Sequence, residues 1–262
     1  MREPTDVVSF EDLGIDRFTV NGNLNSARNG TMLALVGNPR GTYTEDCQDP
    51  NNADFVRMVV TADLGRFRVR GIRPAVEALQ AIMDEIARDK PHVHAIMGTA
   101  GMLCCRLVRG SSTSISNHSW GTAIDLTLGG HLDAHGGGKT QFGLFEIHAI
   151  FNAHGFYWGA AFPKEDSMHF EASDQLIRRW ARDGLLGDQP VRVAIGMLNF
   201  GDRSPEVFSL QQALNRALGL GIDTDGVFGK DTRAAVMEFQ RRNGLSVDGV
   251  VSKPMMAKLG IA

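Results

Sequence analysis

A carboxylate inside an apolar segment constrains this chain more than any other feature of its sequence. Asp125 stands in the run Ala123-Ile124-Asp125-Leu126, which otherwise has the composition of a buried strand. Burying a carboxylate is costly unless the group is paired or coordinates a metal. His118 lies upstream, and it comes within reach if a turn at Gly121 folds the intervening loop back over the strand. The sequence therefore predicts a buried polar site around Asp125.

A second histidine lies in a similar setting further along the chain. The segment Asp166-Ser167-Met168-His169-Phe170-Glu171 places His169 in a short apolar stretch flanked by carboxylates. Two histidines and one aspartate suit Zn²⁺ and leave a fourth position for water, whose pKa zinc lowers to about 7. Asp166 or Glu165 could then take a proton and return it to a leaving amine.

Each residue also has a simpler interpretation. His118 and His169 could be hydrogen-bonded or buried without a metal, Asp125 could have another buried partner, and Glu165 and Glu171 could be solvated carboxylates. The chain has eight histidines, so their number decides nothing. Non-haem iron sites also use two His and one carboxylate, but they usually place the carboxylate closer to the first His. The residue types and their spacing alone leave the metal site a hypothesis.

A family resemblance strengthens this hypothesis. The pattern Ser116-x-His118-x-x-Gly121-x-Ala123-x-Asp125, followed by Asp166-x-x-His169, resembles the zinc D-alanyl-D-alanine carboxypeptidase and L-alanyl-D-glutamate endopeptidase family. That family shares its fold with lysostaphin-type peptidases and the hedgehog signalling domain. The resemblance covers about residues 70–180, and it implies an α+β zinc peptidase domain. Residues 1–70 have no counterpart in it, and the sequence does not indicate their role.

The resemblance also implies roles for single residues. The zinc ligands would be His118, Asp125 and His169. Asp166 matches the catalytic base, which makes Glu165 the lesser candidate. Residues three apart on a straight strand face opposite sides, so Asp166 and His169 can serve one site only if the chain turns near Ser167.

The remaining implied roles concern the substrate. Arg106 resembles the arginine that pairs with a substrate carboxylate and stabilises the developing oxyanion, a task suited to its planar donors; Arg109 is the alternative. Ser116 matches a hydroxyl that contacts substrate. Trp120 and Trp158 would line the cleft or pack in the core. Met168 stands where the family often has Trp, which affects a cleft wall or a core contact.

The C-terminal segment contains a short repeat. Asp225-Gly226-Val227-Phe228-Gly229-Lys230 is similar to Asp248-Gly249-Val250-Val251-Ser252-Lys253, and each copy predicts a turn before a helix. Helices are expected at 207–218 and 231–242, with apolar residues at core spacing. From about residue 196 to 262 the segment resembles the three-helix peptidoglycan-binding domain. The second copy is degraded, since Ser252 replaces Gly and Met255 replaces Thr. A helical domain with another partner is the alternative.

Elsewhere the expected elements are mixed. Helices are predicted at 73–88 and 144–153, and strands at 93–97, 102–108, 123–128, 156–158 and 168–170. Shorter strand-like pieces lie at 32–36 and 55–61, and the glycine-rich stretch 129–143 predicts a surface loop. Helices and strands do not alternate regularly, which favours an α+β fold. The predicted domains are a peptidase domain at 1–182, including the extension 1–70, a linker at 183–195 and a wall-binding domain at 196–262.

Composition excludes some other classes. The net charge of −3 gives no indication of nucleic acid or an anionic membrane as a partner. No apolar run approaches the ~20 residues that span a bilayer. The N-terminus lacks the apolar region of a signal peptide, so the protein is held in the cytoplasm or a leader has been removed. The three cysteines are expected to be small buried side chains. Nothing in the sequence suggests more than a monomer.

The two motifs point to the same polymer. The sequence thus predicts a zinc-dependent peptidase that cuts the stem peptide of bacterial peptidoglycan, and a lysin-type endopeptidase similar to those of phages is the leading hypothesis. One alternative is a bacterial D-alanyl-D-alanine carboxypeptidase that remodels the wall. Another is a non-catalytic wall-binding protein whose zinc is structural. In each case the protein would act at the cell wall.

Overall fold

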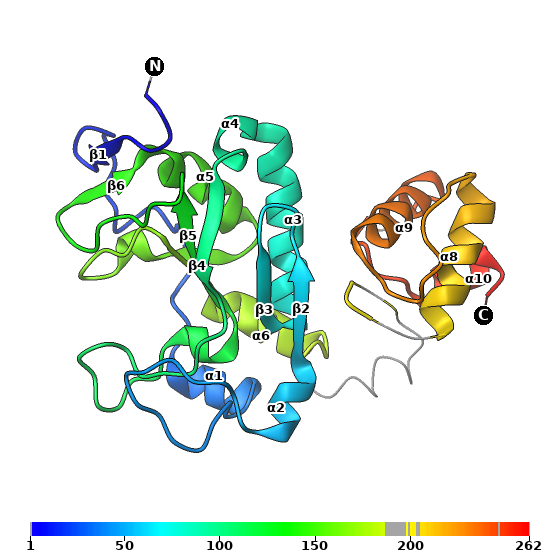
Figure 1. Cartoon of the computed structure of the whole chain (residues 1–262), viewed down its shortest axis with the longest axis horizontal. Coiled ribbons are helices and arrows are strands. Elements are labelled where there is room, and N and C mark those ends of the chain that lie inside the picture. Colours follow the sequence, from blue (N-terminus) through cyan, green and yellow to red (C-terminus); the bar gives the residue numbers. More distant parts are fainter. Residues whose placement is uncertain (1, 187–197, 199, 203–204, 246, 262) are drawn as a thin grey trace. The chain divides into compact units, whose positions relative to one another are not determined.

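The chain folds into two compact units, residues 1–187 and 188–262 (Figure 1). The computed structural model describes residues 2–186, 198, 200–202, 205–245 and 247–261. Most of the predicted linker at 183–195 therefore lies outside the described residues. The described helices include none that is long and apolar enough to cross a membrane.

A four-stranded antiparallel sheet organises the first unit. Its order is β4 (Met97–Gly101), β5 (Ala123–Leu128), β8 (His169–Ala172) and β7 (Phe156–Trp158). β5 lies inside the sheet, and its side chains Ile124, Leu126 and Leu128 are fully buried. The register of β5 and β8 sets Asp125 opposite His169. Two motifs far apart in the sequence are thereby joined at one point of the sheet.

Helices pack around this sheet. α3 (Arg73–Asp89) runs beside the hairpin of β2 (Val59–Asp63) and β3 (Arg68–Ile72), and it also contacts α5 (Phe142–Ala153). Its buried side chains recur at helical spacing, as the sequence predicts: Val76, Leu79, Ile82, Met83 and Ile86. α6 (Asp174–Arg182) is capped by Ser173, whose hydroxyl accepts a hydrogen bond from the Leu176 amide. The helices and small antiparallel sheets confirm the α+β class.

The first 70 residues belong to the first unit. β1 (Val7–Ser9) pairs with β6 (Lys139–Gln141), so part of the expected loop at 129–143 is a strand. The Asn21 side chain is buried between chain segments: its amide donates to the Trp158 carbonyl at 2.9 Å and its oxygen accepts from the Trp158 amide at 2.7 Å. The N-terminal segment is therefore packed against the edge strand β7.

Several short elements differ from the sequence predictions. The strand predicted at 32–36 is largely replaced by helix α1 (Asn29–Leu35). The strand predicted at 93–97 begins within helix α4 (Pro91–His94) and meets β4 only at Met97, and the one predicted at 55–61 begins within helix α2 (Ala53–Met58). Residues 102–108 form only isolated bridges, such as Gln48 with Cys105. These are short apolar runs, in which periodicity does not separate a strand from a buried helical turn.

The second unit shows the predicted repeat in its hydrogen bonds. It contains α8 (Pro205–Leu218), α9 (Lys230–Arg242) and α10 (Lys253–Leu259). Gln211 donates to Asp225 at 2.8 Å and accepts from the Gly226 amide at 2.9 Å. Gln240 donates to Asp248 at 2.7 Å and accepts from the Gly249 amide at 3.0 Å. Each Asp-Gly turn is thus held by a glutamine from the helix preceding it.

The cysteines differ from the expectation of three buried thiols. Cys47 and Cys104 form a disulfide, whereas Cys105 is a free buried thiol. Adjacent cysteines cannot easily bridge each other, but the bridge between Gln48 and Cys105 brings Cys47 beside Cys104. Burial raises the pKa of the Cys105 thiol to about 11.

These assignments predict a thiol count. A native, unreduced sample is expected to react slowly with a thiol reagent at pH 8, because the Cys105 thiol is buried and protonated. Unfolding without a reductant should expose one thiol, and unfolding with reduction should expose three. The measurement is a colorimetric thiol titration in the presence and absence of guanidinium. Three thiols without reduction would contradict the disulfide.

Candidate metal centre

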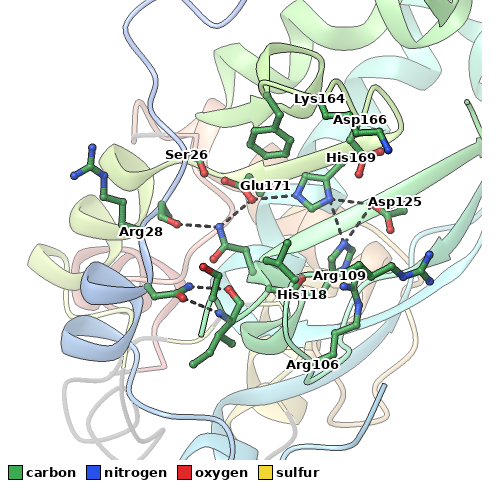
Figure 2. Close-up of a pocket in the computed structure, with 18 of the residues that line it drawn as sticks. Ser26, Arg28, Arg106, Arg109, His118, Asp125, Lys164, Asp166, His169 and Glu171 are labelled. Atoms are coloured by element: carbon green, nitrogen blue, oxygen red, sulfur yellow. Dashed lines mark hydrogen bonds and ion pairs between the residues drawn. The ribbon is translucent and has the colours of Figure 1, made fainter. Parts of the chain in front are cut away.

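The three residues predicted as ligands lie together. His118 comes from the 3₁₀ helix η1 (Asn117–Trp120), Asp125 from β5 and His169 from the start of β8. One ligand atom from each lies within 4.8 Å of the other two. Asp125 Oδ1 is 3.3 Å from His118 Nε2 and 3.0 Å from His169 Nδ1, and the two nitrogens are 3.2 Å apart. Figure 2 shows the three side chains converging.

A tight backbone contact positions His118. Gly121 has a φ of +58°, and its amide donates to the His118 carbonyl at 2.9 Å, which closes the predicted turn. A Cβ atom at Gly121 would lie 2.5 Å from the Cα of Gly71, and one at Gly71 would lie 2.4 Å from the Gly121 oxygen. Both positions therefore require glycine, because the backbone of the loop meets the backbone of β3 at this point.

The outer hydrogen bonds of the histidines orient their rings. His118 Nδ1 lies 2.8 Å from the Met102 carbonyl oxygen, which can only accept, so this nitrogen carries the proton. His169 Nε2 lies 3.0 Å from Glu171 Oε2, another acceptor. The nitrogens that remain for ligation are His118 Nε2 and His169 Nδ1, and these are the two that face Asp125.

The electrostatics of the cluster suit a cation. Burial disfavours a charge on His169, but hydrogen bonds with Asp125 and Glu171 raise its pKa to about 10. Burial disfavours the Asp125 carboxylate too, yet hydrogen bonds with His118 and His169 hold its pKa well below the usual range. Protons shared among these groups can be exchanged for a divalent cation, since metal binding releases protons from its ligands.

A zinc ion fits this donor set. Two imidazole nitrogens and one carboxylate oxygen are common zinc ligands, and a catalytic site keeps a further position open. The three side chains line a cavity of about 1080 Å³, and the Asp125 side chain is 23% exposed. The cluster is therefore accessible from one side.

Asp166 lies in the same cavity, as predicted. The His169 amide donates to the Asp166 carbonyl at 3.1 Å, so the chain turns at Ser167 and both side chains can face one site. Asp166 Oδ1 is buried and has no hydrogen-bond partner among the described residues, while Oδ2 lies 4.0 Å from His135 Nε2. Burial raises the pKa of Asp166. These are the properties of a proton acceptor.

Glu165 lies in a different environment. Its side chain is 4% exposed and accepts a hydrogen bond from the Gly138 amide, while its carbonyl accepts from Gly136 at 3.0 Å. It does not line the cavity around the cluster. The structure thus separates the two carboxylates that the sequence left as candidates for the base.

The predicted substrate-binding residues divide into two groups. Arg106, Arg109 and Ser116 line the cavity, and the Ser116 amide donates to the Arg106 carbonyl at 3.0 Å. Trp120 does not: it is fully buried, and its indole N–H donates to the Gly37 carbonyl at 2.7 Å. Of the two possibilities for Trp120, contact with substrate at the cleft wall is therefore wrong and packing in the core is right, because the helical turn that presents His118 directs the indole into the core. Trp158 is also fully buried.

Other cavity residues were not found from the sequence. They include Asn117, His135, Lys164, Glu171 and the N-terminal segment 25–29. Glu171 was considered only as a solvated carboxylate, although its position two residues after His169 on one strand places both on the same face. The segment 25–29 carries no recognisable motif. Its place in the cavity depends on tertiary packing.

Comparisons with known proteins match two parts of the chain. Residues 109–172 match a family model described as "D-alanyl-D-alanine carboxypeptidase", and residues 203–259 match one described as "Putative peptidoglycan binding domain". The first match contains the three clustered residues and Asp166, and it begins after Arg106. A curated protein, "Uncharacterized protein in bpoA1 3'region" of Kitasatospora aureofaciens, is 44% identical over 64 residues, which are 24% of this chain and 54% of that protein.

Two solved structures are also similar over part of the chain. A peptidoglycan-binding protein from Clostridioides difficile, in complex with glutamine hydroxamate, has 36% identity and a TM-score of 0.23, and the match covers 24% of this chain and 40% of that one. A Burkholderia AP3 phage endolysin has 39% identity and a TM-score of 0.23, with 24% of each chain covered. The chain spans about half of the curated relative and less of these structures.

Proposed function

The chain combines a segment of the D-alanyl-D-alanine carboxypeptidase family with a peptidoglycan-binding domain, and on that premise we propose that it is a zinc-dependent endopeptidase of the peptidoglycan stem peptide. The observation that carries the proposal is the cluster of His118, Asp125 and His169 in an open cavity beside Asp166. The two family matches support the wall polymer as substrate.

The residues of the site divide the chemistry among them. His118, Asp125 and His169 would hold the metal. When bound, zinc supplies a Lewis acid and lowers the pKa of water to about 7. Asp166 would accept the proton of the attacking water and return it to the leaving amine. Arg106 would pair with a substrate carboxylate and stabilise the developing oxyanion, with Ser116 as a further contact and Arg109 beside it.

The C-terminal domain would keep the enzyme on its polymer. Tethering raises the local concentration of a substrate without any new contact in the active site. In this proposal the second unit binds peptidoglycan, and the protein acts at the cell wall as a monomer, in the manner of a lysin.

An endopeptidase is favoured by the extent of the cavity. The residues that line it extend from the N-terminal segment 25–29 to Arg106, Arg109 and the segment 114–116. Figure 2 shows Arg28 and Arg109 on opposite sides of the histidines, which suits a peptide that continues beyond both sides of the cut bond. The matched family description favours the alternative, a bacterial carboxypeptidase that removes a terminal D-alanine.

A digest of purified peptidoglycan tests the proposal. Mass spectrometry of the zinc-loaded protein's products should reveal fragments with a new N-terminal D-glutamate or diamino acid. Free D-alanine would instead support the carboxypeptidase. Removing the metal with a chelator should reduce cleavage to background, and added zinc should restore it. If the wild type binds the wall but cleaves nothing, the chain is a non-catalytic wall-binding protein.

A further inference from the structure

A buried carboxylate outside the ligand set is the strongest feature that the proposed chemistry leaves without a role. We propose that Glu171 is the positioning residue of the metal centre: it fixes the ring of His169 so that Nδ1 faces the metal. It does so within a hydrogen-bond network that also contains Asn117 and the N-terminal segment 26–29. This inference rests on the metal centre proposed above.

The geometry of β8 places Glu171 against the outer nitrogen of His169. The two residues are two positions apart on one strand, so their side chains share a face of the sheet. Glu171 Oε2 lies 3.0 Å from His169 Nε2, and the Glu171 side chain is only 3% exposed. A carboxylate can only accept here, so it requires the proton on Nε2 and leaves Nδ1 for ligation.

The same oxygen also binds the element that carries His118. The Asn117 side-chain amide donates to Glu171 Oε2 at 2.9 Å. Because Asn117 is the neighbour of His118, a single carboxylate oxygen connects the two histidine-bearing segments. Figure 2 shows Glu171 on the side of His169 that faces away from Asp125.

The N-terminal segment completes this hydrogen-bond network. The Asn117 amide also donates to the Ala27 carbonyl at 3.0 Å. Asn29 exchanges two hydrogen bonds with the backbone of Ile115, both at 2.7 Å, and Ser26 bridges Ser173. The segment that has no counterpart in the family resemblance therefore holds the outer shell of the site.

Outer hydrogen bonds of this kind have measurable effects. A carboxylate on the second nitrogen of a ligating histidine fixes its tautomer and raises its basicity as a ligand. Losing such a partner typically costs 10–100-fold in metal affinity. A carboxylate that only stabilised the fold would leave the metal affinity and the tautomer unchanged.

Two substitutions separate these roles. Glu171→Ala removes the acceptor and should weaken zinc binding about 10–100-fold. Glu171→Gln keeps an acceptor but loses the charge, so its affinity should fall between those of Glu171→Ala and the wild type. Glu85→Gln is the matched control. The Glu85 carboxylate accepts a hydrogen bond from His154 at 2.7 Å, but neither residue lines the cavity, so this variant should bind zinc as tightly as the wild type.

Two quantities are measured for these variants, the zinc affinity and the tautomer of His169. Competition with a chromophoric chelator gives the zinc affinity of each full-length variant. Histidine ¹⁵N NMR gives the tautomer of His169, which should be Nε2-protonated in the zinc-bound wild type and Glu171→Gln, and mixed in Glu171→Ala. Rescue of the tautomer by the glutamine is the signature of a positioning role.

The outcomes distinguish the two proposals. A wild type that binds no zinc would refute the metal centre itself. A wild type that binds zinc, with Glu171→Ala equal to it in affinity and tautomer, would refute the role of Glu171 alone. Thermal unfolding of the metal-free proteins shows whether each variant folds. If Glu171→Ala does not fold, Glu171→Gln decides, because an affinity equal to that of the wild type would overturn the proposal.

Discussion

Replacing Asp125 with alanine is expected to abolish peptide cleavage and to weaken zinc binding by roughly two orders of magnitude. Four-ligand zinc sites bind with about 10–16 kcal/mol, so one ligand contributes about 3 kcal/mol, and every 1.4 kcal/mol corresponds to a factor of ten. Asp125 Oδ1 also lies within 3.3 Å of His118 Nε2 and 3.0 Å of His169 Nδ1, the two nitrogens that remain for ligation. Its loss removes the charge that draws a cation to the cluster.

The substitution of Asp125 is expected to affect the metal site and to leave the fold intact. Asp125 pairs with His169 through the backbone register of β5 and β8, and a substitution of the side chain leaves this ladder in place. The metal-free variant should therefore keep the circular dichroism of the wild type and should still bind insoluble peptidoglycan through the C-terminal unit. Asp84→Ala, on an exposed position of α3, is the control that should keep full activity. Full cleavage by Asp125→Ala would remove the cluster from the mechanism.

Local chemistry raised this site as a hypothesis, and the family resemblance implied which residues would form it. A carboxylate within the apolar run of β5 needs a counter-charge wherever the strand lies. The expected turn at Gly121 brought His118 within reach of Asp125. A turn near Ser167 was expected because residues three apart on a straight strand face opposite sides. The structure contains both turns. What residue types and spacing could not supply was the register of β5 and β8, which is set by two segments 44 residues apart.

The residues that were missed have no such local signature. Asn117, Ala27 and Asn29 lie together only because tertiary packing brings the N-terminal segment beside residues 115–117, and the polar turns of that segment carry no periodic pattern. Trp120 shows the opposite error. It stands beside a ligand in the sequence, but on a tight helical turn neighbouring side chains point in different directions, so proximity to His118 does not imply proximity to substrate.

The helix and strand predictions failed where the elements are short. The long amphipathic helix α3 and the repeat of the C-terminal unit follow from periodicity over many residues. By contrast, α1, α2 and α4 are single or double turns whose apolar residues also suit a strand. Their tertiary contacts, such as those of α1 with α6 and of α4 with α3, join segments that no local pattern connects.

Replacing Asp166 with asparagine is expected to reduce kcat by about 10²–10⁴-fold while zinc affinity and wall binding stay close to those of the wild type. General acid–base catalysis by a positioned side chain contributes a factor of this size. Asp166 lines the cavity beside the ligands, but no ligand atom of the cluster belongs to it. Asparagine keeps the size of the side chain and cannot accept the proton of the attacking water.

Glu165→Gln is the matched control for this variant. The neighbouring carboxylate is also buried, but it accepts a hydrogen bond from the Gly138 amide, which a glutamine oxygen can accept as well. Single-turnover cleavage of a synthetic stem peptide should therefore be slow in Asp166→Asn and close to normal in Glu165→Gln, with equal zinc content in both. Two adjacent carboxylates of one segment would then differ only in the direction they face. The reverse result would assign the base to Glu165 and would require the 165–168 turn to rearrange around the substrate.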